Sequence, residues 1–108
     1  MEHFIHINEA NFEEKVLQSD TPILLEFGAV WCGPCKRVEP ELVKLSESLS
    51  GKLLIAKLDV DESVNITLKY NVMSVPTIVL FVNGEPCARM SGFLPQERIF
   101  NKIEAFIS

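Results

Sequence analysis

The sequence predicts an α/β fold with a central mixed sheet of about five strands flanked by four helices. Two observations support this fold class. Short apolar runs alternate with segments of helical periodicity, which is typical of strands joined by helices. The last two apolar runs are instead joined through Asn83-Gly84, a strong signal for an antiparallel hairpin. The 108 residues with 47% apolar content suffice for one core, so we expect a single domain over residues 1–108 in the order β-α-β-α-β-α-β-β-α.

The N-terminal part predicts a short strand at 4–7 and then a helix to about residue 18. Asn11 is the expected cap of that helix. Residues 22–29 form an apolar run without strict alternation, which is typical of a strand covered on both faces. We expect a central parallel strand here, which would support the loop that follows it.

A long helix is predicted next, because Val38, Leu42 and Leu45 recur at helical spacing. Pro40 lies inside this pattern and should kink the helix. Gly51 is expected to end it.

The second half predicts strands at 53–59, at 77–82 and near 87–91, with a short helix at 62–70. Pro95 is expected to open the last helix. The apolar residues of that helix are predicted to share one face: Ile99, Phe100, Ile103, Phe106 and Ile107.

Charge and composition exclude several classes of function. Ten Lys and Arg against fifteen Asp and Glu give a net charge of −5, without a basic cluster, so we expect no nucleic-acid partner. No run approaches the roughly 20 apolar residues of a membrane helix, and the N-terminus does not read as a signal or transit peptide. We therefore expect a cytoplasmic monomer without a membrane partner, in which three cysteines do not form a disulfide scaffold.

The candidate site is the pair Cys32 and Cys35, three positions apart where a predicted strand meets a predicted helix. A cysteine in the first turn of a helix meets unpaired N–H groups and the positive end of the helix dipole, which favour the thiolate. A thiolate attacks disulfides, so the pair predicts dithiol/disulfide exchange. A zinc half-site is the alternative. It is disfavoured because Cys87, His3 and His6 are scattered along the chain, so we expect no metal and no bound cofactor.

Several further segments follow one another at the spacing found in a known family. The chain resembles the thioredoxin family over nearly its whole length. The segments that carry the resemblance are Trp31-Cys32-Gly33-Pro34-Cys35-Lys36, Pro40, Ala56-Lys57-Leu58-Asp59, Val75-Pro76-Thr77, Phe81-Val82-Asn83-Gly84-Glu85 and Gly92. The resemblance implies that Cys32 is an exposed attacking thiol, Cys35 a buried resolving thiol and Pro76 a cis-proline.

It also implies protein substrates that contain disulfides, and recharging by an NADPH-dependent thioredoxin reductase. Gly33-Pro34 between the thiols favours a reductant over a specialised thiol oxidase or isomerase. A non-catalytic partner-binding module that uses the same groove is a second alternative.

Three residues depart from the family pattern. Glu26 stands where the family usually has aspartate, Gly28 where an aromatic residue is usual, and Val30 where a polar residue is frequent. Because Gly28 removes a large side chain from beneath the active-site loop, we expect looser packing there.

Glu26 and Lys57 are ionisable residues inside apolar strands. Desolvation should raise the pKa of Glu26 and suit it to take the proton from Cys35. Lys57 is expected to pair with Glu26. The alternative is that both side chains reach the sheet edge as solvated charges.

A groove for an extended substrate is expected beside the thiols. The Val75 backbone would pair with the substrate, and Gly92 would permit a close backbone approach. The adaptable apolar surface around the groove would come from Trp31, Pro34, Met73 and Val75. The alternatives are a core role for Trp31, an ordinary turn proline at position 76 and a bulge glycine at position 92. Cys87 is interpreted as a small, partly buried residue, with a secondary redox site as the alternative.

Overall fold

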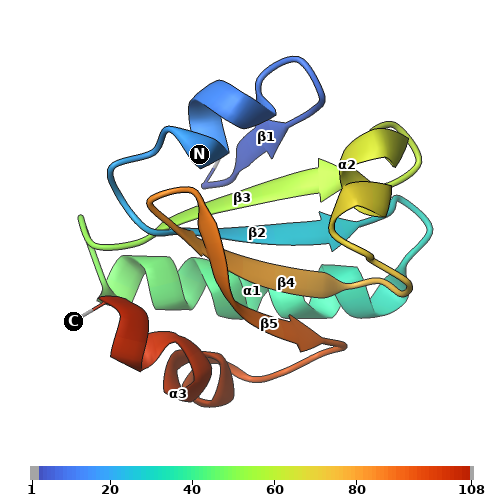
Figure 1. The fold of residues 1–108 in the computed structure, drawn as a ribbon. Coiled ribbons are helices and arrows are strands. Elements are labelled where there is room, and N and C mark those ends of the chain that lie inside the picture. Colours follow the sequence, from blue (N-terminus) through green and yellow to red (C-terminus); the bar gives the residue numbers. More distant parts are fainter. Residues whose placement is uncertain (1–2, 108) are drawn as a thin grey trace.

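The computed structural model describes residues 3–107, so Met1, Glu2 and Ser108 of the predicted domain lie outside the described residues. A mixed sheet of five strands in the order β1-β3-β2-β4-β5 runs through its centre (Figure 1). The strands are β1 (Ile5–Ile7), β2 (Ile23–Gly28), β3 (Leu54–Asp59), β4 (Thr77–Val82) and β5 (Glu85–Ser91).

The direction of the strands confirms the predicted mixed sheet. β3 pairs in parallel with both β1 and β2, whereas β4 pairs antiparallel with β2 and β5. The hairpin prediction is therefore correct, and Asn83 and Gly84 both have positive φ in its turn. β2 is central and buried along its whole length, as expected, although only one of its two neighbours is parallel.

Helices cover both faces of the sheet (Figure 1). α1 (Gly33–Ser48) and α3 (Gln96–Ile107) pack on one face, while η1 (Glu13–Leu17) and α2 (Val64–Lys69) lie on the other. Each face has its own apolar cluster, and residues of β2 alternate between the two. Leu24 belongs to the cluster under α1 and α3, while Leu25 and Phe27 belong to the opposite cluster. Glu26 therefore shares the face of Leu24, underneath α1.

The N-terminal helix differs from its prediction. It is a single π-helical turn over Glu13–Leu17, in which the Gln18 N–H donates to the Glu13 carbonyl at 3.0 Å. Asn11 does not cap it, because its side chain accepts from the Asn8 N–H and donates to the His6 carbonyl. The side chain of Asn8 instead accepts the N–H groups of Ala10 and Asn11, which satisfies the turn before the helix.

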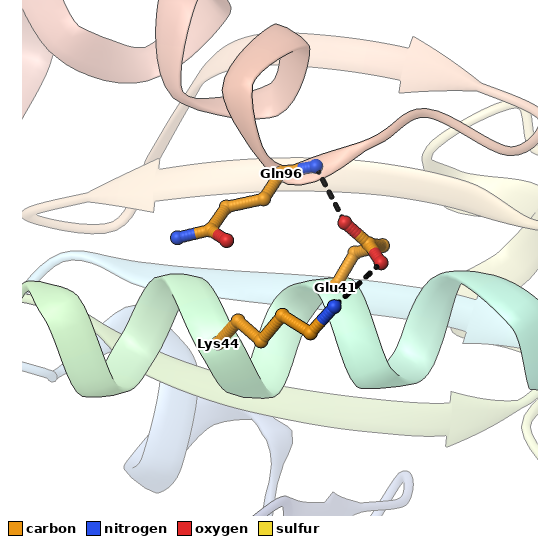
Figure 2. Close-up of polar contacts among 3 residues, drawn as sticks. All are labelled: Glu41, Lys44 and Gln96. Atoms are coloured by element: carbon orange, nitrogen blue, oxygen red, sulfur yellow. Dashed lines mark hydrogen bonds and ion pairs between the residues drawn. The ribbon is translucent and has the colours of Figure 1, made fainter.

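The N-termini of two helices are held by glutamates from distant segments. Glu41 on α1 accepts the N–H of Gln96, the first residue of α3, at 2.8 Å, and its other carboxyl oxygen contacts Lys44 at 3.3 Å (Figure 2). Glu9 accepts the N–H of Asn65 in the first turn of α2 at 2.7 Å. These contacts supply acceptors for N–H groups that a helix leaves unpaired at its start.

The remaining helix predictions hold in outline. Pro40 lies inside α1, which ends at Ser48, and Gly51 occupies a positive-φ turn three residues later. α3 follows Pro95 and buries Ile99 and Ile103, whereas Phe106, predicted on the same apolar face, is 45% exposed. Between residues 3 and 107, the helices are too short or too polar to cross a membrane.

Candidate active site

The two cysteines lie at the N-terminus of α1, where the sequence places them. They form a disulfide with their Cα atoms 5.4 Å apart. Cys32 is the N-cap residue of α1, and its Sγ accepts the backbone N–H of Cys35 at 3.1 Å. This N–H and the positive end of the helix dipole both favour negative charge on the Cys32 sulfur once the disulfide is opened.

The exposure of Cys32 differs from what the resemblance implies. Its exposed fraction is 3%, against 1% for Cys35, so both side chains are buried. In the disulfide, the Cys32 sulfur turns inward against Cys35 and its N–H, which removes it from solvent. Cys32 is the more accessible of the two thiols only by this small margin.

Apolar side chains near the disulfide are exposed rather than packed in the core. Trp31 is 69% exposed, and its indole N–H donates to Asp61 Oδ2 at 2.9 Å. This placement rules out a core role for Trp31. Val30, Met73 and Phe93 are also exposed, with Met73 at 91%. Exposed apolar side chains at one end of a sheet are typical of an interaction surface.

The segment before β4 and the segment after β5 reach the same end of the sheet as the β2–α1 loop (Figure 1). Across the strands, Phe27 of β2 pairs with Thr77, and Thr77 pairs with Ser91 of β5. The Val75–Pro76 peptide bond is cis, which confirms the expectation for Pro76.

Gly92 closes this part of the site. Its N–H donates to the Pro76 carbonyl at 2.9 Å, and its φ of +80° is one that L side chains rarely adopt. A Cβ placed there would meet no described atom within 4 Å, so the space above it is open to a substrate backbone. Pro76 itself is buried, whereas Val75 is partly exposed. Gly33 and Pro34 form the first turn of α1 between the two cysteines.

Glu26 lies directly beneath the disulfide. A Cβ placed on Gly28 would be 2.8 Å from Glu26 Oε2 and 3.3 Å from Cys35 Sγ, so the carboxyl group and the sulfur border the same point. The glutamate side chain thus occupies the space beside Gly28. Glu26 and Gly28 nevertheless line a cavity of about 420 Å³, which agrees with the looser packing expected at this position.

Lys57 does not pair as predicted. It is the register partner of Glu26 on β3, yet its Nζ makes an ion pair with Glu39 Oε1 on α1 at 3.5 Å. Its ammonium also lies 5.3 Å from the centre of the Phe4 ring. Within residues 3–107, no group donates a hydrogen bond to either carboxyl oxygen of Glu26, but the protonated carboxyl group hydrogen-bonds to the Glu39 side chain. Lys57, the predicted partner of Glu26, therefore pairs with Glu39, which lies four residues beyond Cys35 on α1.

The electrostatic state of Glu26 follows from its burial and from the charges beside it. Its side chain is 1% exposed, which excludes the alternative of a solvated charge at the sheet edge. Burial, then the negative charge of Glu39 and a hydrogen bond to its side chain, raises the pKa of Glu26 from 4.5 to about 9, and the positive charge of Lys57 opposes this rise. Glu26 is therefore protonated at neutral pH.

The third cysteine does not join the site. Cys87 is a free, partly buried thiol whose sulfur donates to the Leu80 carbonyl at 3.6 Å, and burial raises the pKa of this thiol. Its placement agrees with the interpretation as a small, partly buried residue. The described part of the chain holds no group of three or more His, Cys, Asp or Glu side chains arranged to bind a metal ion.

Two residues of this region were not predicted from the sequence. Glu39 follows Cys35 by four positions, a spacing that places both on one face of a helix, so helical periodicity could have found it. Asp61 lies two residues after the end of β3, near the site, which is a weaker signal.

Comparison with known proteins agrees with this geometry. A family model described as Thioredoxin matches residues 3–105. The chain is 42% identical over 107 residues to a thioredoxin of Haemophilus influenzae, covering 99% of this chain and 100% of that one. It is 37% identical over 106 residues to a thioredoxin of Pseudomonas aeruginosa, covering 98% of each. It is also 37% identical over 102 residues to an M-type chloroplastic thioredoxin of Spinacia oleracea, covering 94% of this chain but only 56% of that one.

Proposed function

The chain belongs to the thioredoxin family and is a protein-disulfide oxidoreductase, and we propose that it works as a reductase recharged by an NADPH-dependent thioredoxin reductase. One observation carries the proposal. The Cys32–Cys35 disulfide caps α1, and the Cys35 N–H donates to the Cys32 sulfur. That donor favours a thiolate on Cys32 after reduction, and a thiolate is the attacking form in exchange with a substrate disulfide.

In the first step, the Cys32 thiolate attacks one sulfur of a substrate disulfide. A Cys32–substrate mixed disulfide forms, and the other substrate sulfur leaves as a thiolate that takes a proton from water. The attack requires the buried Cys32 sulfur to become accessible, so we propose that the substrate docks on the adjoining exposed surface first.

That surface is formed by Trp31, Gly33, Pro34, Met73 and Val75 on one side of the disulfide. The exposure of Trp31 and Met73 supports this assignment. The open space over Gly92 gives an extended substrate backbone a close approach to Val75.

In the second step, Cys35 loses its proton and attacks the Cys32 sulfur. The bond from Cys32 to the substrate breaks, the substrate leaves as a thiolate, and the Cys32–Cys35 disulfide forms, so two electrons have passed to the substrate. We propose that ionised Glu26 takes the Cys35 proton, since its carboxyl group and the Cys35 sulfur border the same point next to Gly28. Lys57 acts on this step through its positive charge, which favours the ionised form of Glu26.

The proposal includes a single domain and a monomer that works in the cytoplasm. The match of the family model over residues 3–105 supports one domain. The unpaired Cys87 thiol supports a reducing compartment, because free thiols persist there.

Reduction of insulin disulfides by the whole chain, with NADPH and a thioredoxin reductase, tests the proposal. We expect NADPH consumption that depends on this protein and disappears when both Cys32 and Cys35 are changed to serine. A double-serine variant that retains the biological function of the wild type would instead identify a binding module. Efficient oxidation of reduced substrates, without turnover by the reductase, would indicate an oxidase or isomerase.

A further inference from the structure

Glu39 is a third charged side chain beside Glu26 and Lys57, the two residues that the sequence predicts to pair. Glu26 and Lys57 are register partners on β2 and β3, so Lys57 is a possible counter-ion for Glu26 on the neighbouring strand. Glu39 reaches down from α1 and forms the ion pair with the Lys57 ammonium. Among the described residues, no group donates a hydrogen bond to the buried Glu26 carboxyl group, whose hydrogen-bonding neighbour is Glu39 itself.

We propose that Glu39 is a positioning residue that withholds the Lys57 ammonium from Glu26 and thereby keeps the Glu26 carboxyl group protonated at neutral pH. The effect on Glu26 stands on the ion pair and the strand register. Its consequence for Cys35 rests on the proposed function.

Two physical effects of Glu39 act in the same direction. Its negative charge disfavours a second negative charge on Glu26, and its ion pair removes a positive charge that would favour one. The repulsion, together with a hydrogen bond from the protonated carboxyl group to Glu39, contributes to the raised pKa of Glu26 after the larger effect of burial. Removing the charge of Glu39 should therefore reverse both effects together.

The other charged side chains around Glu26 do not replace Lys57. Glu26 lines a cavity of about 420 Å³ that is also lined by His6 of β1, Lys36 of α1, Asp59 of β3 and Glu62 after β3. Lys36 donates to the Val30 carbonyl at 3.0 Å, and Asp59 accepts the Asp61 N–H at 2.8 Å. Glu62 is an acidic residue and therefore supplies no cation to Glu26.

The cavity connects the charges to solvent. It is roomy and polar enough to hold water, which gives the proton of Glu26 a route out of the protein. Under the proposed function, Cys35–SH and ionised Glu26 exchange one proton to give the Cys35 thiolate and protonated Glu26. The thiolate then attacks the Cys32 sulfur, and Glu26 returns its proton to water in the cavity. Glu39 thus limits how much Glu26 is ionised at the start of this step.

The decisive experiment is an NMR titration of the Glu26 carboxyl carbon in the wild type and in Glu39→Gln. We expect the Glu26 midpoint to fall by roughly 1 to 3 pH units in the variant, because an opposite charge at close range produces a shift of that size. Glu47→Gln is the matched control, since it removes the same charge from an exposed position of α1 and should leave the midpoint unchanged. Circular dichroism verifies that each variant is folded.

A second comparison isolates the role of Lys57. In a Lys57→Met background, Glu39→Gln should shift the Glu26 midpoint by clearly less, because only the repulsion is then removed. An unchanged Glu26 midpoint in Glu39→Gln would overturn the proposal whatever the turnover. Equal shifts with and without Lys57 would overturn it as well, because no lysine would then be withheld.

Stopped-flow measurement of the resolution step separates this inference from the proposed function. With a thionitrobenzoate mixed disulfide on Cys32, we expect the pH profile of release to move to lower pH by the same amount as the Glu26 midpoint. This means about tenfold faster release at neutral pH for each unit. A shifted Glu26 midpoint with an unmoved release profile would support the effect of Glu39 on Glu26. It would contradict Glu26 as the proton acceptor of Cys35.

Discussion

Replacing Glu26 with glutamine should remove a large pH dependence from the stability of the oxidised protein. The pKa of Glu26 rises from 4.5 in an exposed chain to about 9 in the fold. Between these two values the folded state holds a proton that the unfolded state has released. Stability is therefore fully present below the lower value, falls as the pH rises through this window and levels off above the upper one.

The magnitude follows from the size of the window. Each pH unit inside it costs about 1.4 kcal/mol, so the wild type should lose about 4 kcal/mol between about pH 5 and pH 8 through this group alone. Glu26 is 1% exposed, so solvent screening does not reduce this figure much. Glutamine keeps the shape and cannot ionise. The variant should therefore match the wild type near pH 5 and exceed it at pH 8.

Urea unfolding at a series of pH values, followed by circular dichroism, measures the difference between the two proteins. Subtracting one curve from the other cancels the titration of all other groups, and Glu47→Gln is the control for loss of an exposed charge. Parallel curves for wild type and Glu26→Gln would refute the reasoning, because they would mean that Glu26 titrates alike in the folded and unfolded states.

Four further predictions concern the thiols, the tryptophan and the helix cap. Cys35→Ser should accumulate mixed disulfides with protein substrates on non-reducing gels, whereas Cys32→Ser should accumulate none, since Cys32 is the attacking thiol. Reduction of the wild type should raise the fluorescence of Trp31, because a neighbouring disulfide quenches indole emission. Cys87→Ser should retain insulin reductase activity near that of the wild type, because this thiol lies outside the site. Glu41→Gln should lower the Tm in calorimetry at neutral pH and change it little in acid, because the Gln96 N–H lowers the pKa of Glu41.

A specific result would contradict each of these four predictions. Trapping by Cys32→Ser instead of Cys35→Ser would reverse the two thiol roles. Equal emission in both redox states would place the indole away from the disulfide. A folded Cys87→Ser protein with little activity would make that thiol part of the reaction. A Glu41→Gln variant with the Tm of the wild type at neutral pH would mean that the contact with α3 does not stabilise the fold.

The order of strands and helices could be predicted because it depends on local pattern. β2 is an apolar run without alternation, and the structure buries it on both faces at the centre of the sheet. The Asn83-Gly84 turn has positive φ at both residues, which only a few residue types accept. The N-terminal helix could not be predicted in detail, because Asn8 and Asn11 both offer side chains to the same turn and only tertiary packing decides between them.

The candidate site was predictable where it depends on the backbone and less so where long side chains decide. Cys32 lies at the helix N-terminus because the strand ends just before it. Lys57 is next to Glu26 in the strand register, and from sequence this is the natural pair. A lysine side chain can reach past its neighbour to another element, and here it reaches Glu39 on α1. Such a choice depends on packing between layers, which a single sequence does not display.

Glu41 and Glu9, which bind the N-termini of α3 and α2, restrict substitution at their partner positions to different degrees. Glu41 must keep an acceptor of its own length, whereas position 96 contributes only its backbone N–H to this bond, so the bond itself tolerates any residue there except proline (Figure 2). The Gln96 side chain donates separately to Ser48 at 3.5 Å. Asn65 is more restricted, because its side-chain amide also donates to Glu9 at 3.1 Å. Positions 41 and 96 are therefore in contact without any reason to vary together. A search for correlated substitutions among relatives would pass over the bond that joins the first turn of α3 to the helix that carries Cys35.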